Sequence, residues 1–204
     1  MNKVRLENFS DGVFAIAVTL LVLGIKIPEA KHMDNHQLTQ RLLESIPQLL
    51  TFGFTFMVIG VFWVAHSRIF SMTKLVDSTL LWLNVFYLMF VAVMPYPATL
   101  LAENPFLTSS ILLYSGTLFI IGLMHFILLR HIYKTDHIKN EMFTEPVYQS
   151  YLRSGITAPS IYILAGAFSF VQPYISFGLI VGALVYYIFF SGKRLERELI
   201  THRK

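Results

Sequence analysis

Six long runs of hydrophobic residues follow one another along this chain, and short polar stretches separate them. Each run is close to the roughly 17–25 residues that an α-helix needs to cross about 30 Å of hydrocarbon. Lengths of this kind suit helices, which satisfy their own backbone, far better than the shorter alternating strands of a membrane barrel. The pattern therefore predicts an all-α integral membrane protein with six transmembrane helices, at about 9–27, 49–66, 78–101, 108–129, 156–172 and 174–191.

Prolines mark several of the predicted helix ends. Pro28 is expected to end the first helix and Pro47 to start the second, because proline suits a first turn and stops a helix that precedes it. Pro95 is expected to disturb the third helix, and Pro159 to lie in the first turn of the fifth. The polar connection at 26–45 is long enough for a short amphipathic helix.

The composition supports membrane insertion. Of the 204 residues, 55% are hydrophobic and 14% are charged, and the mean hydropathy is +0.60. The six runs leave no room for a soluble domain, so residues 1–204 are expected to form a single domain in the lipid bilayer. The chain has no cysteine, which excludes disulfides, thiolate metal sites and cysteine nucleophiles.

The positive charges are unevenly distributed between the two sides of the predicted bundle. The net charge is +4, but the basic residues flank apolar runs and form no patch interleaved with exposed aromatics, so we expect no nucleic-acid partner. Thirteen of the 16 lysines and arginines fall in the two termini and the second and fourth connections. The positive-inside rule then predicts that both termini are cytoplasmic.

One stripe of the first predicted helix has a spacing close to 3.5 residues. It comprises Arg5, Phe9, Gly12, Ile16, Thr19 or Leu20, and Leu23. Rings of the aliphatic members from several chains would form a narrow apolar constriction, and the Thr19 hydroxyls could replace part of an ion's hydration shell. Apolar residues at this spacing are equally typical of ordinary helix packing, so the pattern alone leaves both interpretations open.

Asp11 is an ionisable group at the edge of this apolar helix, where a charge is costly and usually functional. It lies about 140° around the helix from Ile16, which favours an anchoring contact with neighbouring helices over a position in a pore. Arg5 is about 120° from Asp11 and cannot pair with it, so each needs a partner from another element. Trp63, His66 and Asn84 lie at a suitable depth.

Arg5, Phe9, Ser10 and Asp11 fit an Arg-x-x-x-Phe-Ser-Asp signature, and the run GVFAIAVTLLVL follows it. With the six-span layout, the chain resembles a prokaryotic member of the endosomal and lysosomal potassium channel family. Human-type members carry two six-helix units in one chain, whereas this sequence has one. The resemblance therefore implies a homotetramer in the plasma membrane of a bacterium, with four copies of the first helix around a pore that conducts potassium passively.

The resemblance also implies roles for individual residues. In this family the first helix lines the pore and bulky aliphatic residues form the constriction, and Ile16 and Leu23 stand at matching positions. Polar residues on neighbouring helices brace the signature, matched here by Trp63, by His66 in HSRIF and by Asn84 in WLN. No TVGYG-like filter is present, so selectivity would follow the cost of dehydration, which favours potassium over sodium.

The same residues leave other functions open. The main alternative is a proton-coupled cation transporter that uses Asp11, although clear inverted repeats and broken helices are missing from the sequence. His66 and His125 could ligate a haem. A hydrolytic trio of Ser10, His66 and Asp11 is disfavoured, because adjacent residues point about 100° apart on a helix. We expect no enzyme activity, no cofactor, and no metal beyond the permeating potassium.

Overall fold

The computed structural model describes residues 2–26 and 34–191, and the regular structure of these residues is helical apart from one isolated bridge between Thr73 and Lys139. The elements are α1 (Lys3–Leu20), the 3-10 turn η1 (Leu21–Gly24), α2 (Asn35–Glu44), α3 (Ile46–Ser71), α4 (Ser78–Val93), α5 (Pro95–Glu103), α6 (Thr108–Lys134), α7 (Glu145–Phe168), α8 (Pro173–Tyr186) and the π-helical turn η2 (Tyr187–Ser191).

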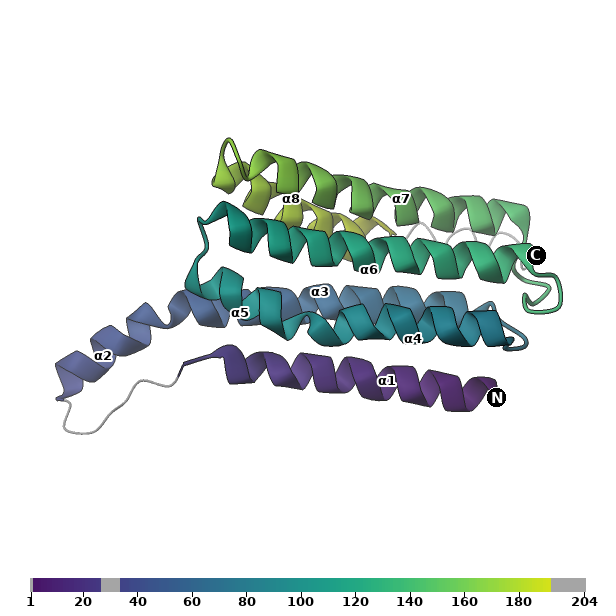
Figure 1. Cartoon of the computed structure of the whole chain (residues 1–204), viewed down its shortest axis with the longest axis horizontal. Coiled ribbons are helices and arrows are strands. Elements are labelled where there is room, and N and C mark those ends of the chain that lie inside the picture. Colours follow the sequence, from purple (N-terminus) through teal and green to yellow (C-terminus); the bar gives the residue numbers. More distant parts are fainter. Residues whose placement is uncertain (1, 27–33, 192–204) are drawn as a thin grey trace.

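The long helices run side by side along one axis (Figure 1). α1 forms one edge of the bundle and packs on α4 and α3, while α6, α7 and α8 pack together on the opposite side. The start of α1 and the α3–α4 and α6–α7 connections lie at the same end, and α2 projects beyond the other end. We call the end that holds the start of α1 the N-terminal end of the bundle.

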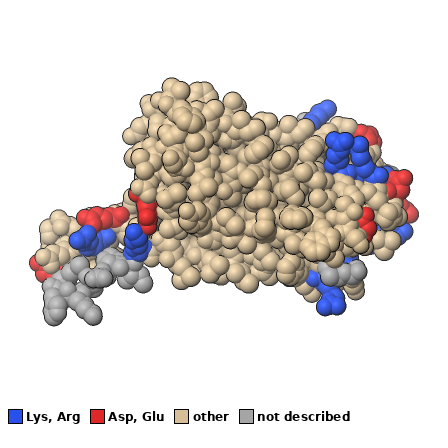
Figure 2. All heavy atoms as spheres, in the orientation of Figure 1, with Lys and Arg blue, Asp and Glu red and all other residues tan. Residues whose placement is uncertain are grey.

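Charged side chains gather at the two ends of the molecule, and a wide band between them is free of charge on the face drawn in Figure 2. By length and composition, four helical stretches can cross a membrane: Lys3–Gly24, Asn35–Ser71, Ser78–Glu103 and Thr108–Lys134. A shorter apolar helix covers Pro173–Phe189. These counts refer to residues 2–26 and 34–191. The chain is an all-helical membrane protein whose six long helical segments occupy the six predicted hydrophobic runs.

Several predicted helix boundaries differ from the structure: α1 begins at Lys3, α3 ends at Ser71 and α6 ends at Lys134. The α-helical part of the first segment ends at Leu20 and continues as the 3-10 turn η1, and Pro28 lies outside the described residues. α7 begins at Glu145, so Pro159 lies inside this helix and not in its first turn. Its first turns carry the polar side chains of Glu145, Gln149 and Arg153, so the apolar pattern begins well after the helix does.

Two other predicted features are confirmed. The third hydrophobic run is divided where Pro95 starts a new helix, so that α4 ends at Val93. The first long connection holds the amphipathic helix α2, whose N-terminus is capped by Asp34: its carboxylate accepts a hydrogen bond of 2.7 Å from the backbone N–H of Gln37.

Candidate pore helix and its bracing contacts

α1 has one face inside the protomer and one outside it. Leu6, Ser10, Phe14, Ala17 and Leu21 are buried against the neighbouring helices. The opposite face holds the four residues predicted to form a constriction, which are Ile16, Thr19, Leu20 and Leu23, and all four are exposed. The side chains of Ile16 and Leu23 are 60% and 76% exposed. A single chain therefore leaves an apolar stripe of α1 uncovered.

The end of this stripe departs from the predicted helical spacing. Leu23 belongs to η1, where about three residues make a turn in place of 3.6, so the angular position of Leu23 differs from that on a continued α-helix. The Thr19 hydroxyl donates to the carbonyl oxygens of Ala15 and Ile16 at 3.0 and 2.9 Å. Its proton is thus used within the helix, and its oxygen lone pairs stay available on the exposed face.

Asp11 and Trp63 join α1 to α3. The indole N–H of Trp63 donates a hydrogen bond of 2.8 Å to Oδ1 of Asp11. This contact agrees with the prediction that Asp11 turns toward a neighbouring helix. Arg5 and Phe9 are both exposed, and none of the ion pairs among the described residues includes Arg5.

A second set of polar contacts lies buried behind the exposed apolar face of α1. The Asn84 amide donates from Nδ2 to Ser10 Oγ at 3.0 Å, and its Oδ1 lies 2.7 Å from His66 Nε2. Ser10 Oγ in turn donates to the Leu6 carbonyl at 2.8 Å. Because the Asn84 oxygen can only accept, the proton of a neutral His66 belongs on Nε2. One asparagine on α4 thus links α1 with α3.

Aromatic rings surround the buried His66. Its ring stacks on Phe70 and Tyr87 with centroid distances of 4.3 and 5.3 Å, and Phe14 on α1 lies 5.7 Å away. Tyr87 also contacts His125 at 6.0 Å. Haem ligation would need open space between the two imidazoles, and the Tyr87 ring packs against both.

The structure does not assemble the hydrolytic trio. Ser10 and His66 are each bound to Asn84 and not to each other, while Asp11 is bound to Trp63. The serine proton is held by a backbone carbonyl. No base therefore reaches the hydroxyl to activate it as a nucleophile.

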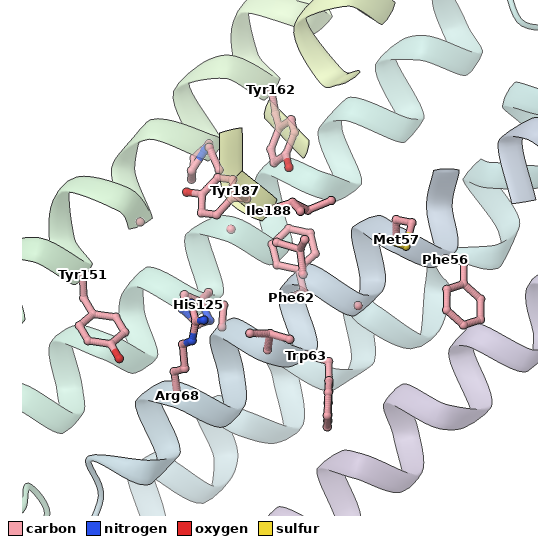
Figure 3. A pocket seen from close by; sticks show the side chains of 18 residues that line it. Phe56, Met57, Phe62, Trp63, Arg68, His125, Tyr151, Tyr162, Tyr187 and Ile188 are labelled. Atoms are coloured by element: carbon pink, nitrogen blue, oxygen red, sulfur yellow. The ribbon is translucent and has the colours of Figure 1, made fainter. Parts of the chain in front are cut away.

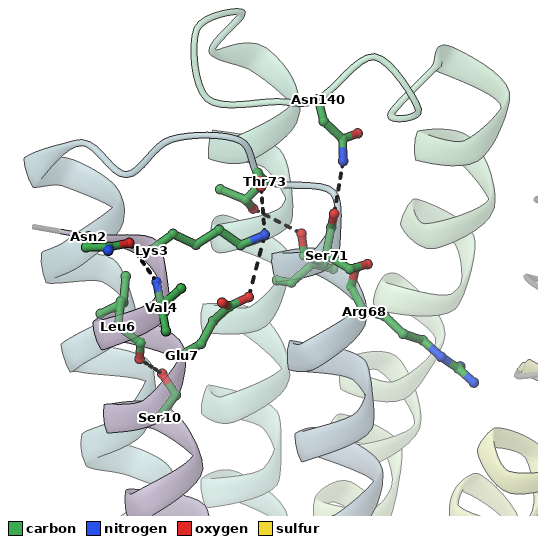
Figure 4. Close-up of polar contacts among 11 residues, drawn as sticks. Asn2, Lys3, Val4, Leu6, Glu7, Ser10, Arg68, Ser71, Thr73 and Asn140 are labelled. Atoms are coloured by element: carbon green, nitrogen blue, oxygen red, sulfur yellow. Dashed lines mark hydrogen bonds and ion pairs between the residues drawn. The ribbon is translucent and has the colours of Figure 1, made fainter.

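Further contacts at the N-terminal end were not anticipated from the sequence. Lys3 donates to the Thr73 carbonyl at 2.9 Å and lies 3.6 Å from the Glu7 carboxylate, so the start of α1 is tied to the α3–α4 connection (Figure 4). Asn140 donates to the Ser71 carbonyl at 2.9 Å and ties the α6–α7 connection to the same place. These bonds go to backbone carbonyls, which leave no mark in a sequence pattern.

Asp77 caps α4 and pairs with α6. Its carboxylate accepts a hydrogen bond of 2.6 Å from the Leu80 backbone N–H and lies 3.1 Å from Nε2 of His131. Partial burial raises the pKa of Asp77, but the bonds from Leu80 and His131 outweigh it, and the pKa lies below its ordinary value.

Known proteins are similar to this chain in sequence and in fold. The sequence profile described as "Endosomal/lysosomal potassium channel TMEM175" matches residues 5–95, which span α1 to the start of α5. A potassium channel of Chamaesiphon minutus is 34% identical over 186 residues, which cover 90% of this chain and 92% of that protein. The chain belongs to the TMEM175 family. Every predicted site residue falls within the segment that the TMEM175 profile matches.

A crystal structure and an animal relative from the TMEM175 family are also similar to this chain. The crystal structure of a lysosomal potassium-selective channel TMEM175 homolog from Chamaesiphon minutus matches with a TM-score of 0.81 at 33% identity, over 93% of this chain and 97% of that one. The endosomal/lysosomal proton channel TMEM175 of Gallus gallus is 28% identical over 190 residues, which cover 87% of this chain but 37% of that protein.

Proposed function

We propose that this chain is a passive, potassium-selective channel in which four copies place their α1 helices around a central pore. The observation that carries the proposal is the exposed apolar face of α1, on which Ile16, Leu20 and Leu23 lie together with Thr19. An apolar face on an otherwise braced helix is expected to meet its equivalents in a symmetric assembly. The potassium channel of Chamaesiphon minutus supports the choice of ion.

The chemistry of such a pore follows from its lining. Rings of Ile16, Leu20 and Leu23 offer no oxygen atoms to replace an ion's water, so passage requires a narrow, partly dehydrated path. Sodium holds its water more tightly than potassium and pays a larger dehydration cost. Of the four predicted constriction residues, only Thr19 has a side-chain oxygen. Because its proton is used within the helix, its lone pairs can contact an ion. Selectivity for potassium then arises because sodium costs more free energy to dehydrate, and not from a filter of backbone carbonyl groups.

The bracing contacts fix the orientation of α1 relative to such a pore. The Trp63–Asp11 bond and the Ser10–Asn84–His66 chain hold α1 from the side away from Ile16. The Ser10–Asn84–His66 chain is buried, and a buried polar network specifies one helix orientation when all of its members are satisfied. We therefore assign these residues a positioning role and the apolar residues the conduction role.

The same proposal includes the placement of the chain in the membrane. Residues 1–204 form one channel domain in the plasma membrane of a bacterium, with both termini in the cytoplasm. The distribution of lysine and arginine between the connections supports this orientation. The N-terminal end of the bundle, with Lys3, Arg68 and Lys74, would then face the cytoplasmic leaflet.

A proton-coupled cation transporter that uses Asp11 is the second candidate. It is favoured by the exposed carboxylate of Asp11 on α1 and by the name of the Gallus gallus relative, a proton channel. The hydrogen bond from Trp63 argues against it, because it ties the Asp11 carboxylate to a neighbouring helix and occupies one of its two oxygens.

The deciding experiment is ion flux in liposomes that contain the purified protein. Under a potassium gradient and with no proton gradient, potassium should move at a rate that grows with the driving force, and sodium should move more slowly. Potassium movement that requires counter-movement of protons would replace the channel with the transporter. Equal rates for both ions would remove the proposed selectivity mechanism.

A further inference from the structure

A groove of about 500 Å³ lies between α3, α6, α7 and η2 (Figure 3). Its walls are mostly apolar, and several of them are also exposed on the outside of the protomer, among them Phe56, Met57 and Val64. The groove is therefore open toward the exterior of the bundle. Its volume falls in the range of small-molecule sites.

We propose that this groove binds an anionic phospholipid, with an acyl chain along α3 and the headgroup at Arg68. The lining on α3 extends from Phe56 to Arg68, which is about 18 Å along a helix axis. One leaflet of the hydrocarbon core is about 15 Å deep, half of the usual 30 Å. The groove thus has the length of one leaflet.

The polar groups of the groove gather at one end. Figure 3 shows Arg68, His125 and Tyr151 toward one side and Met57 and Phe56 toward the other. Arg68 lies three residues before the end of α3, at the N-terminal end of the bundle. An apolar channel that ends at a basic residue matches the polarity of a lipid anchored at the interface.

Two buried polar atoms in this end of the groove lack a partner. Nδ1 of His125 and the hydroxyl of Tyr151 make no hydrogen bond among the described residues, although the two side chains are only 9% and 6% exposed. A buried polar atom without a partner costs about 1–3 kcal/mol. Phosphate and ester oxygens of a lipid would accept from the Tyr151 hydroxyl and from a neutral His125 ring that carries its proton on Nδ1.

The charge of Arg68 is also available. None of the ion pairs within residues 2–26 and 34–191 includes Arg68, and Figure 4 shows its side chain pointing away from the Lys3 and Glu7 contacts. Arginine presents a planar set of donors that fits phosphate oxygens in a bidentate manner. A guanidinium with no ion pair among the described residues favours an anionic headgroup over a zwitterionic one.

Glycines on facing helices make the space. A Cβ added at Gly60 on α3 or at Gly155 on α7 would meet no heavy atom within 4 Å, whereas one at Gly122 on α6 would lie 2.9 Å from Cγ of Pro159. The groove can therefore be filled from Gly60 or Gly155 without displacing the backbone, while Gly122 is needed for contact with Pro159.

A native tryptophan can report lipid binding in the groove. It has two tryptophans, Trp63 in the wall of the groove and Trp82 on α4, outside it. The Trp82→Phe variant leaves Trp63 as the single fluorophore. We would titrate the purified variant in detergent with phosphatidylglycerol or phosphatidylcholine that carries brominated acyl chains, because bromine quenches indole fluorescence on contact. The proposal predicts saturable quenching, reached at several-fold lower concentration with phosphatidylglycerol.

Four further variants in the same background locate the effect. Gly155→Leu should abolish the saturable quenching, while Gly178→Leu on α8, where an added Cβ also meets nothing within 4 Å, should behave like the parent. Gly60→Leu replaces Gly155→Leu if the latter does not elute as an assembled protein. Arg68→Gln should keep the quenching but remove the preference for phosphatidylglycerol.

Unchanged quenching in both groove-filling variants would show contact with bulk lipid alone and overturn the proposal. Equal quenching by the two lipids in the parent would remove the role of Arg68. Absence of any quenching in the assembled protein would assign the groove to a neighbouring subunit. The readout is binding, so it stays valid whether or not the protein conducts potassium.

Discussion

Trp63 on α3 donates its indole N–H to the Asp11 carboxylate on α1 across 2.8 Å, and the same side chain forms part of the groove wall between α3 and α7. One residue thus contacts both the proposed pore helix and the proposed lipid site. The bond gives the Asp11 side chain a hydrogen-bond donor at the edge of an apolar helix, where a polar group without a partner is costly.

Loss of the Trp63 bond should destabilise the protein. Trp63→Phe keeps an aromatic ring but removes the donor, at an expected cost of about 1 kcal/mol, or about 2–4 °C in apparent Tm for a chain of this size. The measurement is the fraction of assembled protein that survives heating, followed by size-exclusion chromatography. Trp82→Phe, at a 60% exposed residue of α4, is the matched control and should melt like the parent. Equal melting of both variants would contradict the bracing role.

Asn84 should matter more, because its amide serves two buried partners. Asn84→Leu leaves His66 without an acceptor and Ser10 without its donor, and the expected cost is about 2 kcal/mol, or roughly 4–8 °C. Asn104→Leu is the control, since its amide makes one bond of 3.4 Å to Leu100 and lies at the far end of the bundle. The hypothesis fails if the two leucine variants melt within a degree or so of each other.

The apolar face of α1 should set ion selectivity. Leu23→Ser places a hydroxyl where the side chain is 76% exposed, which wets the proposed constriction and lowers the dehydration barrier. Sodium flux in liposomes should rise several-fold relative to potassium flux. Leu164→Ser on α7, at a residue that is 49% exposed, should leave the ratio unchanged. If both variants keep the parent ratio at equal protein content, Leu23 lies outside the constriction.

The Asp77–His131 contact should make the stability of the folded protein depend on pH. Because the pKa of Asp77 is lowered on folding, its ionised form stabilises the folded state above the ordinary value of 3.8, and this contribution is lost as the pH falls through the lower folded pKa. Asp77→Asn keeps a capping side chain without the charge. The parent should therefore melt at a higher temperature than the variant near neutral pH, and this difference should shrink below about pH 4. A difference that does not shrink below about pH 4 would contradict this account.

Hydropathy located the helices well, because crossing a bilayer demands long apolar runs, and it failed where a helix extends beyond the apolar part. The first turns of α7, with Glu145 and Arg153, look like a loop to any such measure. The turn η1 was also missed, since nothing in the residues Leu21–Gly24 separates a 3-10 turn from an α-helix.

Helical periodicity identified the residues of the site but not all of their partners. Trp63, His66 and Asn84 could be placed at the depth of Asp11, but which of them bonds to Asp11 depends on the rotation of α3. The groove could not be predicted from the sequence. It exists because Gly60 and Gly155, on two helices far apart in sequence, have no side chains to fill the space between them. Packing between helices decides both features.

The most direct test of the central claim, that the exposed face of α1 lines the ion path, uses the absence of native cysteine. Ile16→Cys is introduced on α1 and Ile163→Cys on α7, at residues with similar exposure of 60% and 54% in the protomer. Potassium flux through each reconstituted variant is measured before and after addition of silver ions, which bind thiolates within a water-filled path. The account predicts that silver stops flux through Ile16→Cys and spares Ile163→Cys; flux through Ile16→Cys that persists after silver, or equal block of both variants, would contradict it.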